Sequence, residues 1–413
     1  MSETIAVDKV DYPKLNKVFV AGLYIYALGS HQGRSLISLG VGLVLLTWLI
    51  KVIGYRDTSL NKSVKHWPIF ALALIMIFSR NDFWNVLTSG HVYSVIFPLA
   101  ILNQLKDKKL IYKILGISLG VLFISGIVAN YQYFIEGMRR AEGLARFSIT
   151  SANVSVMGIG ILLPFLFRKE NKPWHYIIAG LGIFVYTTAI IFSMTRAAYF
   201  GLVVVLFLFT LIKKPKLIPV IILLVVLVFN FLPGNVQDRF YTSFDLEGNW
   251  IQNRLIMWRV SIDAVKENPI RGIGYDNYGD YFLEKDYTDG LRDYTSPHNN
   301  YFLFLSETGF TGFFIFLYLS YYLIKLFFLS YIKIPEENNI DRALFLGILL
   351  AVIGFLVTGL TETNIGESQT RNFFWLLVGF GFSLNYFTFY KNNDLSINDE
   401  KQKAEMLGIK QGD

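Results

Sequence analysis

The chain has 413 residues, of which 53% are hydrophobic and 17% are charged, and its basic residues outnumber its acidic ones to give a net charge of +7. A soluble protein carries charge at about a quarter of its residues, so this composition argues against a soluble globular protein. The chain contains no cysteine, which excludes disulfides and thiolate metal sites.

The hydrophobic residues form long apolar blocks, for example 218–232 and 343–360. With their flanks, such blocks approach the roughly 17–25 residues of a membrane-spanning helix. The start of the chain is polar and charged, so we expect no cleavable signal peptide. We predict twelve transmembrane helices, at residues 18–30, 35–54, 67–79, 86–103, 110–130, 151–167, 175–194, 197–212, 217–232, 303–325, 343–360 and 373–390. The expected fold class is an all-α integral membrane protein, with one polytopic membrane domain over 1–390 and a charged cytoplasmic tail over 391–413.

The basic residues between these helices predict the orientation, because cytoplasmic loops of membrane proteins carry an excess of Lys and Arg. Lysine clusters such as 106–109 and 213–216 mark the cytoplasmic side, and the even number of helices places both termini there. The opposite loops, which then face outward, are 31–34, 80–85, 131–150, 195–196, 233–302 and 361–372. The longest of them, 233–302, separates the ninth and tenth helices and is expected to contain a helix of its own.

Arginine dominates the positive charge of the outward loops, which contain only two lysines, Lys266 and Lys285. The arginines are Arg34, Arg80, Arg139, Arg140, Arg146, Arg196, Arg239, Arg254, Arg259, Arg271, Arg292 and Arg371. A guanidinium group binds phosphate or carboxylate oxygens two at a time, whereas lysine offers a point charge. The set therefore indicates a protein that handles a diphosphate outside the cytoplasm, although any single arginine can equally pair with an acidic residue of the loops.

The first segment with a candidate functional residue is FSMTRAAYFG at 192–201, in which Arg196 stands between two apolar runs near the outer boundary. An arginine at membrane depth usually faces a cavity or a partner. The alternative is an arginine that extends to the membrane surface and marks the end of a span.

The second segment is 249–278, where an apolar stripe repeats at helical spacing through Ile251, Leu255, Trp258, Ile262 and Val265. This helix should end before Pro269, and Gly272 and Gly274 then allow a tight turn. We expect it along the outer membrane surface or over the bundle. Arg254 and Arg259 flank the stripe on opposite edges, so at least one of them can point into a site, or both can be solvated.

The third segment, TSPHNNYFLFLSETGFTG at 295–312, predicts a helix that enters the membrane from outside. Ser296 is expected as its N-cap and Pro297 as its first residue. His298 would then lie in the first turn, where free N–H groups favour a phosphate and a neutral imidazole suited to act as a base. The alternative is a histidine that only bonds to a loop.

Weaker candidates lie in two other outward loops. Arg146 lies in LARFSIT, and Glu362 and Arg371 lie in the loop 361–372, where a carboxylate could orient His298 or an arginine. No outward loop contains a D-x-D pair that could help to hold a divalent ion. We therefore expect no metal, and we expect arginines to stabilise the leaving diphosphate.

The motifs resemble those of bacterial O-antigen ligases and their O-antigen polymerase relatives. His298 and Asn299, followed after nine residues by G-x-x-G at Gly309 and Gly312, are similar to the histidine motif of the ligases. T-R-A at 195–197 and P-x-x-G-x-G at 269–274 also look like elements of this family, as does the large outer loop after the ninth of twelve spans.

The resemblance implies a GT-C-like, metal-independent, inverting glycosyltransferase of lipopolysaccharide biosynthesis in the bacterial inner membrane, with 233–302 as a periplasmic loop. The implied partners are an undecaprenyl diphosphate-linked glycan donor, a lipid A–core acceptor and membrane lipids, with neither nucleic acid nor a cofactor. By motif position, His298 would be the catalytic base, and Arg196 and Arg254 would bind the diphosphate. Residues in supporting, substrate-binding roles would be Arg146, Arg259, Asn299, Glu362 and Arg371.

Two alternative functions remain open on the sequence. An O-antigen polymerase shares the layout and the arginines but joins one carrier-linked glycan to another. A flippase or transporter for lipid-linked oligosaccharides would also have many spans, but it would need charged groups within central helices, whereas the charges here lie at the outer edge.

Overall fold

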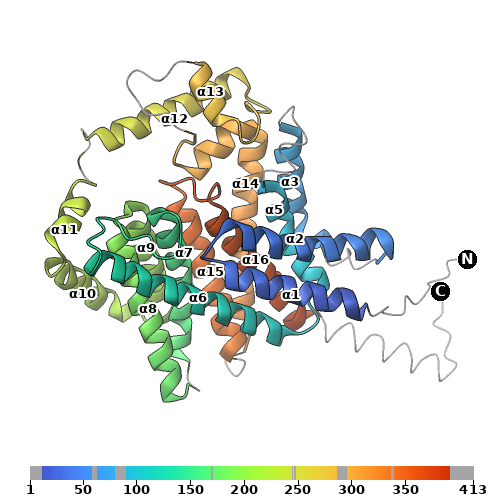
Figure 1. The fold of residues 1–413 in the computed structure, drawn as a ribbon, viewed down its shortest axis with the longest axis horizontal. Coiled ribbons are helices and arrows are strands. Elements are labelled where there is room, and N and C mark those ends of the chain that lie inside the picture. Colours follow the sequence, from blue (N-terminus) through green and yellow to red (C-terminus); the bar gives the residue numbers. More distant parts are fainter. Residues whose placement is uncertain are drawn as a thin grey trace, which may run out of the picture.

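The computed structural model describes residues 12–57, 63–79, 90–168, 171–243, 245, 248–285, 295–335 and 339–390. These residues form helices and connecting segments, and no β-strand occurs among them (Figure 1). The chain start, Arg80, Arg292 and the predicted tail 391–413 lie outside the described residues.

A helix overlaps each of the twelve predicted spans. These helices are α1 (Pro13–Gly29), α2 (Arg34–Leu49, continued by Ile50–Gly54), α3 (Trp67–Ser79), α5 (His91–Gln104), α6 (Lys108–Phe134), α7 (Ser148–Leu162), α8 (Pro173–Ser193), α9 (Arg196–Lys213), α10 (Ile218–Asn230), α14 (Asn300–Lys333), α15 (Asn339–Thr358) and α16 (Ser368–Phe389).

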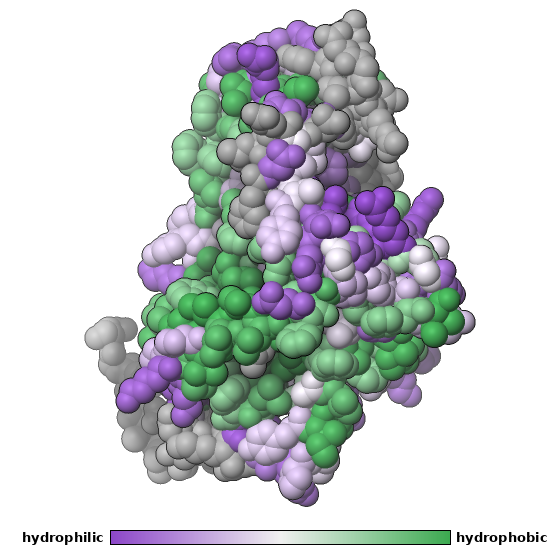
Figure 2. Space-filling model, turned by 90° about the vertical axis from the view of Figure 1, so that its left-hand side faces the viewer, coloured by the Kyte–Doolittle hydropathy of each residue, from purple (hydrophilic) through white to green (hydrophobic). Residues whose placement is uncertain are grey.

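Seven helices in the described part of the chain are long and apolar enough to cross a membrane, namely α2, α6, α7, α8, α9, α14 and α15 with their short continuations. Figure 2 shows hydrophobic residues in a broad band across the middle of one face, with hydrophilic residues above and below the band. The chain is therefore an all-helical, multi-pass membrane protein. The exact number of twelve spans stays a prediction.

The centre of the bundle is formed by α7, α15 and α16. In both α7 and α15, 78% of the apolar span window is buried, whereas the corresponding fraction in α9 is 33%. Every residue of α16 from Gln369 to Leu384 is buried. Helices that are apolar all round belong in such a core, and α7 contacts α8, α9, α15 and α16 there.

In its described residues, the predicted outer loop 233–302 forms the helices α11 (Gly234–Tyr241), α12 (Asn249–Glu267) and α13 (Tyr278–Glu284), of which α12 and α13 lie at the top of the bundle in Figure 1. As predicted, α12 ends before Pro269. Only part of its apolar stripe packs against the bundle. Trp258 stacks on Phe302 with ring centroids 5.2 Å apart, whereas Leu255 and Ile262 are exposed.

The prediction for the start of α14 is wrong. The helix begins at Asn300, and its N-cap is Asn299 rather than Ser296. The Asn299 side-chain oxygen accepts from Tyr301 N (2.8 Å) and from Phe302 N (3.1 Å), which satisfies N–H groups that the first helical turn leaves without a partner. His298 has a left-handed φ of 48°, which cannot continue into a helix, so it lies just before the helix and not in the first turn.

A second feature of α14 is a break at Gly309, whose φ of 64° and ψ of −169° are not helical. The P-x-x-G-x-G segment fills this break: Phe310 N donates to Pro269 O (2.8 Å) and Gly274 N donates to Glu307 O (3.0 Å). Gly272 and Gly274 have φ of 72° and 102°, in agreement with the predicted turn.

The glycines of the G-x-x-G element therefore have different neighbours. A Cβ on Gly309 would lie 2.5 Å from the Ile270 carbonyl carbon, so this glycine admits the loop that follows α12. A Cβ on Gly312 would meet the Thr308 side chain of the same helix and would lie 3.0 Å from Ile75 of α3, so this glycine lies where α3 approaches α14.

Candidate active site

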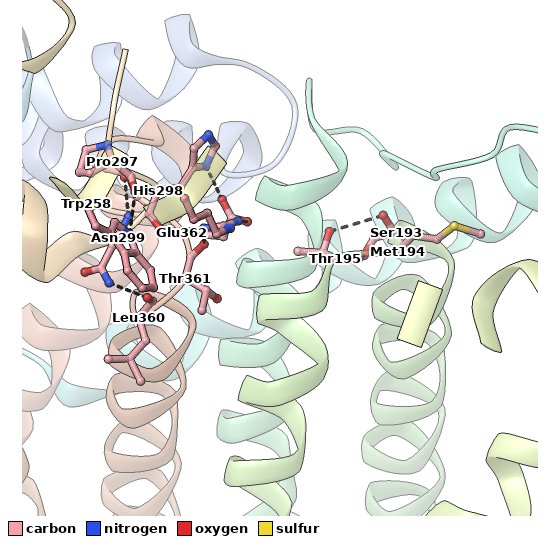
Figure 3. A network of polar contacts seen from close by, with 12 residues as sticks. Ser193, Met194, Thr195, Trp258, Pro297, His298, Asn299, Leu360, Thr361 and Glu362 are labelled. Atoms are coloured by element: carbon pink, nitrogen blue, oxygen red, sulfur yellow. Dashed lines mark hydrogen bonds and ion pairs between the residues drawn. The ribbon is translucent and has the colours of Figure 1, made fainter. Parts of the chain in front are cut away.

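Four of the predicted outward loops converge at one end of the bundle, around a cavity of about 250 Å³. The cavity lies at the C-terminal end of α8, the N-terminal end of α9 and the connection after α15 (Figure 3). Its lining residues are Arg140, Ile149, Met194, Thr195, Arg196, Arg239, Trp250, Asn253, Arg254, Met257, His298 and Glu362.

The connection between α15 and α16 carries Glu362, which bridges two other lining residues. Its Oε2 lies 2.9 Å from His298 Nδ1, and its Oε1 accepts from Arg254 Nη2 at 2.9 Å. Arg254 Nη1 also donates to the carbonyl oxygens of His298 (2.9 Å) and Thr361. The three side chains thus form one relay, which we call the His298–Glu362–Arg254 relay.

The Glu362 side chain has an exposure of 10%. Burial alone would raise the pKa of its carboxyl group, but the hydrogen bonds and charges of His298 and Arg254 outweigh burial and hold this pKa below its usual value. Glu362 is therefore ionised at neutral pH and can only accept hydrogen bonds. Its partner atom His298 Nδ1 must then carry the proton, which makes Nε2 the ring nitrogen with the lone pair.

The backbone around His298 is held from both sides. Trp258 Nε1 donates to Pro297 O (3.2 Å), and Asn299 Nδ2 donates to Leu360 O (2.6 Å). Asn299 thus has a structural position, as the cap of α14 and a link to the α15–α16 connection. A histidine in the left-handed region is uncommon and costs backbone energy, and these bonds maintain it.

Two other arginines of the lining bind the end of α8. Arg140 Nε donates to Ser193 O (3.1 Å), and Arg239 Nε donates to Met194 O (3.2 Å). Burial lowers the pKa of Arg239, and the nearby charges of Arg140 and Arg139 add to this effect. A lowered guanidinium pKa that results partly from neighbouring guanidinium groups indicates a concentration of positive charge that favours an anion.

Arg196 is the first residue of α9 and faces the same cavity. Its Nη2 donates to Thr242 Oγ1 (2.7 Å), and its guanidinium carbon lies 4.2 Å from the centre of the Trp250 ring. Backbone N–H groups at the start of a helix also favour an anion. The T-R-A element therefore places an arginine and a helix N-terminus together at the cavity.

The structure brings together four of the residues selected from the sequence, Arg196, Arg254, His298 and Glu362. Arg146 and Arg259 are exposed and are not part of the cavity lining.

Arg371 also lies away from the cavity lining. It is buried, and it donates to Ser94 Oγ (3.3 Å) and to the carbonyl oxygens of Ile365 (3.0 Å) and Gly366 (2.9 Å). Those contacts tie the α15–α16 connection to α5, so its position is structural.

Sequence reasoning counted Arg140 and Arg239 among the outward arginines but did not select them, and it did not consider Trp250. Neither arginine lies in a short motif, since Arg140 follows Arg139 in a polar loop and Arg239 lies within α11. The signal that could have found them is their place in the loops that flank the T-R-A element. Among the described residues, no group of three His, Asp or Glu side chains is arranged to hold a metal ion.

Comparison with known proteins gives two matches. The chain is 23% identical over 329 residues to an uncharacterized protein of Haemophilus influenzae. The aligned region covers 72% of this chain and 80% of the relative. Residues 181–317, which include α9, the outer helices and His298, match the family model described as O-antigen ligase. This match confirms the resemblance indicated by the motifs and identifies residues 181–317 with the O-antigen ligase family.

Proposed function

We propose that the protein is an O-antigen ligase-type glycosyltransferase that moves a glycan from a lipid diphosphate carrier to an acceptor hydroxyl. The observation that supports this most is the His298–Glu362–Arg254 relay at the edge of a cavity that also contains Arg140, Arg196 and Arg239. A positioned base beside a dense group of guanidinium groups is the arrangement that glycosyl transfer from a diphosphate requires.

In the proposed reaction, Nε2 of His298 removes the proton from the acceptor hydroxyl. The ionised Glu362 keeps the proton of the ring on Nδ1 and stabilises the imidazolium that forms. The positioned base contributes on the order of 10²–10⁴-fold to the rate.

The acceptor oxygen then forms a bond to the anomeric carbon while the bond from that carbon to the diphosphate oxygen breaks. The electron pair of the broken bond stays on the diphosphate, and the arginines of the cavity stabilise its charge. A single displacement of this kind inverts the configuration at the anomeric carbon.

The family match and the charge pattern support a proposal for the donor, the acceptor and the location of the reaction. We propose that the donor is an undecaprenyl diphosphate-linked glycan and that the acceptor is lipid A–core oligosaccharide. Twelve spans, two cytoplasmic termini and a cavity on the periplasmic side of the inner membrane would agree with the lysine-rich and arginine-rich loops.

The test is a transfer assay with the purified protein, carrier-linked glycan and excess chelator, in which lipid A–core is supplied to one reaction and withheld from another. Glycan on lipid A–core despite the chelator would support a metal-independent ligase. Longer carrier-linked glycan in both reactions would make the protein a polymerase, and the absence of any product would contradict both functions.

A further inference from the structure

The last carbonyl groups of α8 are bonded one by one to groups from other segments. Phe192 O accepts from Ala141 N (3.0 Å), Ser193 O accepts from Arg140 Nε, and Met194 O accepts from Arg239 Nε. Carbonyls at a helix C-terminus lack partners within the helix and carry a partial negative charge. They therefore fix two guanidinium groups from distant segments at the same point of the cavity wall.

Arg140 and Arg239 are both attached to α8 through Nε. This leaves donors for a ligand, because a guanidinium group has five N–H donors in one plane. When Nε is used for the anchor, both terminal nitrogens, with four N–H groups, project beyond it. One terminal nitrogen makes a weak further contact, from Arg140 Nη2 to Thr195 Oγ1 at 3.5 Å. Since both side chains line the cavity, their terminal nitrogens are in place for an anion.

Arg254 is engaged differently. Both of its terminal nitrogens already bind protein oxygens, Nη1 the carbonyls of His298 and Thr361 and Nη2 the Glu362 carboxylate. The carboxylate that lines the cavity is thus bonded to Arg254 and acts on Arg239 only as a more distant charge, so the terminal nitrogens of Arg140 and Arg239 are left for a ligand.

We propose that Arg140 and Arg239 form a clamp, anchored on the end of α8, that binds the phosphate oxygens of the donor diphosphate together with Arg196. Arg254 is a positioning residue, which holds Glu362 and the backbone of His298. This inference rests on the proposed function, because it assigns the parts of the same cavity to binding and to chemistry.

Titration calorimetry of the full-length protein in detergent with inorganic diphosphate tests the clamp. Hydrogen bonds between charged groups are stronger than neutral ones, so Arg140→Gln and Arg239→Gln should each raise the Kd about tenfold or more. Lysine variants should bind as weakly as the glutamine variants, because one ammonium group cannot hold the α8 carbonyl and bridge two phosphate oxygens.

Two matched variants separate the clamp from general charge and from catalysis. Arg139→Gln removes the same charge from the exposed neighbouring residue and should change the Kd by less than about threefold. Arg254→Gln should leave diphosphate binding within about threefold while transfer is lost. Equal weakening by Arg139→Gln and Arg140→Gln, or by Arg254→Gln and Arg239→Gln, would overturn the clamp.

The wild-type protein gives a readout that does not depend on the folding of variants. Inorganic diphosphate should protect Arg140 and Arg239 from an arginine-specific dicarbonyl reagent, as measured by mass spectrometry, and should not protect Arg139 or Arg259. If the wild type transfers glycan but neither residue is protected, the clamp is wrong and the proposed function stands. If the wild type transfers no glycan in the assay above, the function itself fails.

Discussion

Glu362 connects two residues of the site, His298 and Arg254, although the sequence offered only that a carboxylate of its loop could orient one of them. It contacts His298 through one oxygen and Arg254 through the other, both at 2.9 Å, although these residues are 64 and 108 positions away in the chain. A carboxylate in this position fixes the tautomer of the imidazole and forms an ion pair with Arg254. The proposed base and the arginine that positions it are therefore coupled through one side chain.

The substitution His298→Ala should reduce the turnover number kcat by roughly 10²–10⁴-fold, which is the range expected for a positioned base. Binding of inorganic diphosphate should change little, because the imidazole is not part of the arginine clamp. Single-turnover transfer and calorimetry measure the two quantities. A variant with wild-type kcat would remove His298 from the mechanism.

Glu362→Gln retains the shape of the side chain but removes its charge. The loss of a charge-assisted hydrogen bond costs roughly 1.5–3 kcal/mol, so we expect kcat to fall about tenfold to a hundredfold. The decrease should be smaller than that for His298→Ala, since the imidazole remains. An effect on the KM for the donor with kcat unchanged would contradict a positioning role.

The pKa of Glu362 also predicts how stability depends on pH. Because the folded-state pKa is below the ordinary value of 4.5, the ionised carboxylate stabilises the folded state above that pH, and this stabilisation is lost as the pH falls through the folded pKa. The difference in melting temperature between the wild type and Glu362→Gln should be constant near neutral pH and should shrink below about pH 4.5. A difference that grows with acidification would contradict the assignment.

At the scale of elements, the P-x-x-G-x-G and G-x-x-G motifs pack against each other and form a joint between α12 and α14. The P-x-x-G-x-G segment after α12 supplies hydrogen bonds at the break of α14, so the helix that carries Arg254 and the helix that follows His298 are fixed to each other. The glycines are required because backbone meets backbone there. This joint explains in physical terms why both motifs occur in the same chain.

Gly272→Ala tests the joint. The residue has φ of 72°, and an added Cβ would lie 2.5 Å from the Glu307 carbonyl carbon, so we expect a loss of at least about 1–3 kcal/mol in stability together with reduced kcat. Gly137→Ala is the matched control, because Gly137 has φ of 68° and open space around its Cβ position. Thermal unfolding in detergent and the transfer assay provide the readouts. Equal effects of the two variants would show that backbone strain alone, and not the joint, is responsible.

At the scale of the whole molecule, the predicted outward loops meet at one end of the bundle. Segments 131–150, 195–196, 233–302 and 361–372 all contribute to the cavity, as Figure 3 shows for the ends of α8, α9 and α15. This convergence agrees with the prediction that these four loops lie on one side of the membrane, because loops on one side can meet only there. Which side faces outward stays a prediction.

The cysteine-free chain permits a direct test of that orientation. Single cysteines replacing the exposed residues Glu136 and Arg259 should react with a membrane-impermeant thiol reagent in intact spheroplasts, whereas cysteines at the exposed residues Lys172 and Lys216 should react only after lysis. Labelling of the Lys172 variant in intact spheroplasts would reverse the orientation, and labelling of all four would contradict the alternation of the spans between these residues.

The sequence by itself determined the class of protein, the position of the helices and three motifs of the site. Each of these depends on local properties: a span needs a continuous apolar stretch, α12 ends shortly before Pro269, and the motifs around Arg196 and His298 are contiguous. The family could therefore be inferred from the order and sidedness of the motifs. The first residue of α14 could not be predicted from the sequence, because Asn299 and Ser296 are both good N-caps. The left-handed turn at His298 depends on partners elsewhere in the chain.

Only the tertiary structure decided which of the outward arginines face the cavity. Arg140 and Arg239 do so because the end of α8 offers them carbonyl acceptors, whereas Arg146 and Arg259 point outward and Arg371 binds a connection beside α5. The direction of a side chain depends on how helices pack, and its partners lie far away in the chain. Composition and spacing give the number of arginines, and packing assigns their roles.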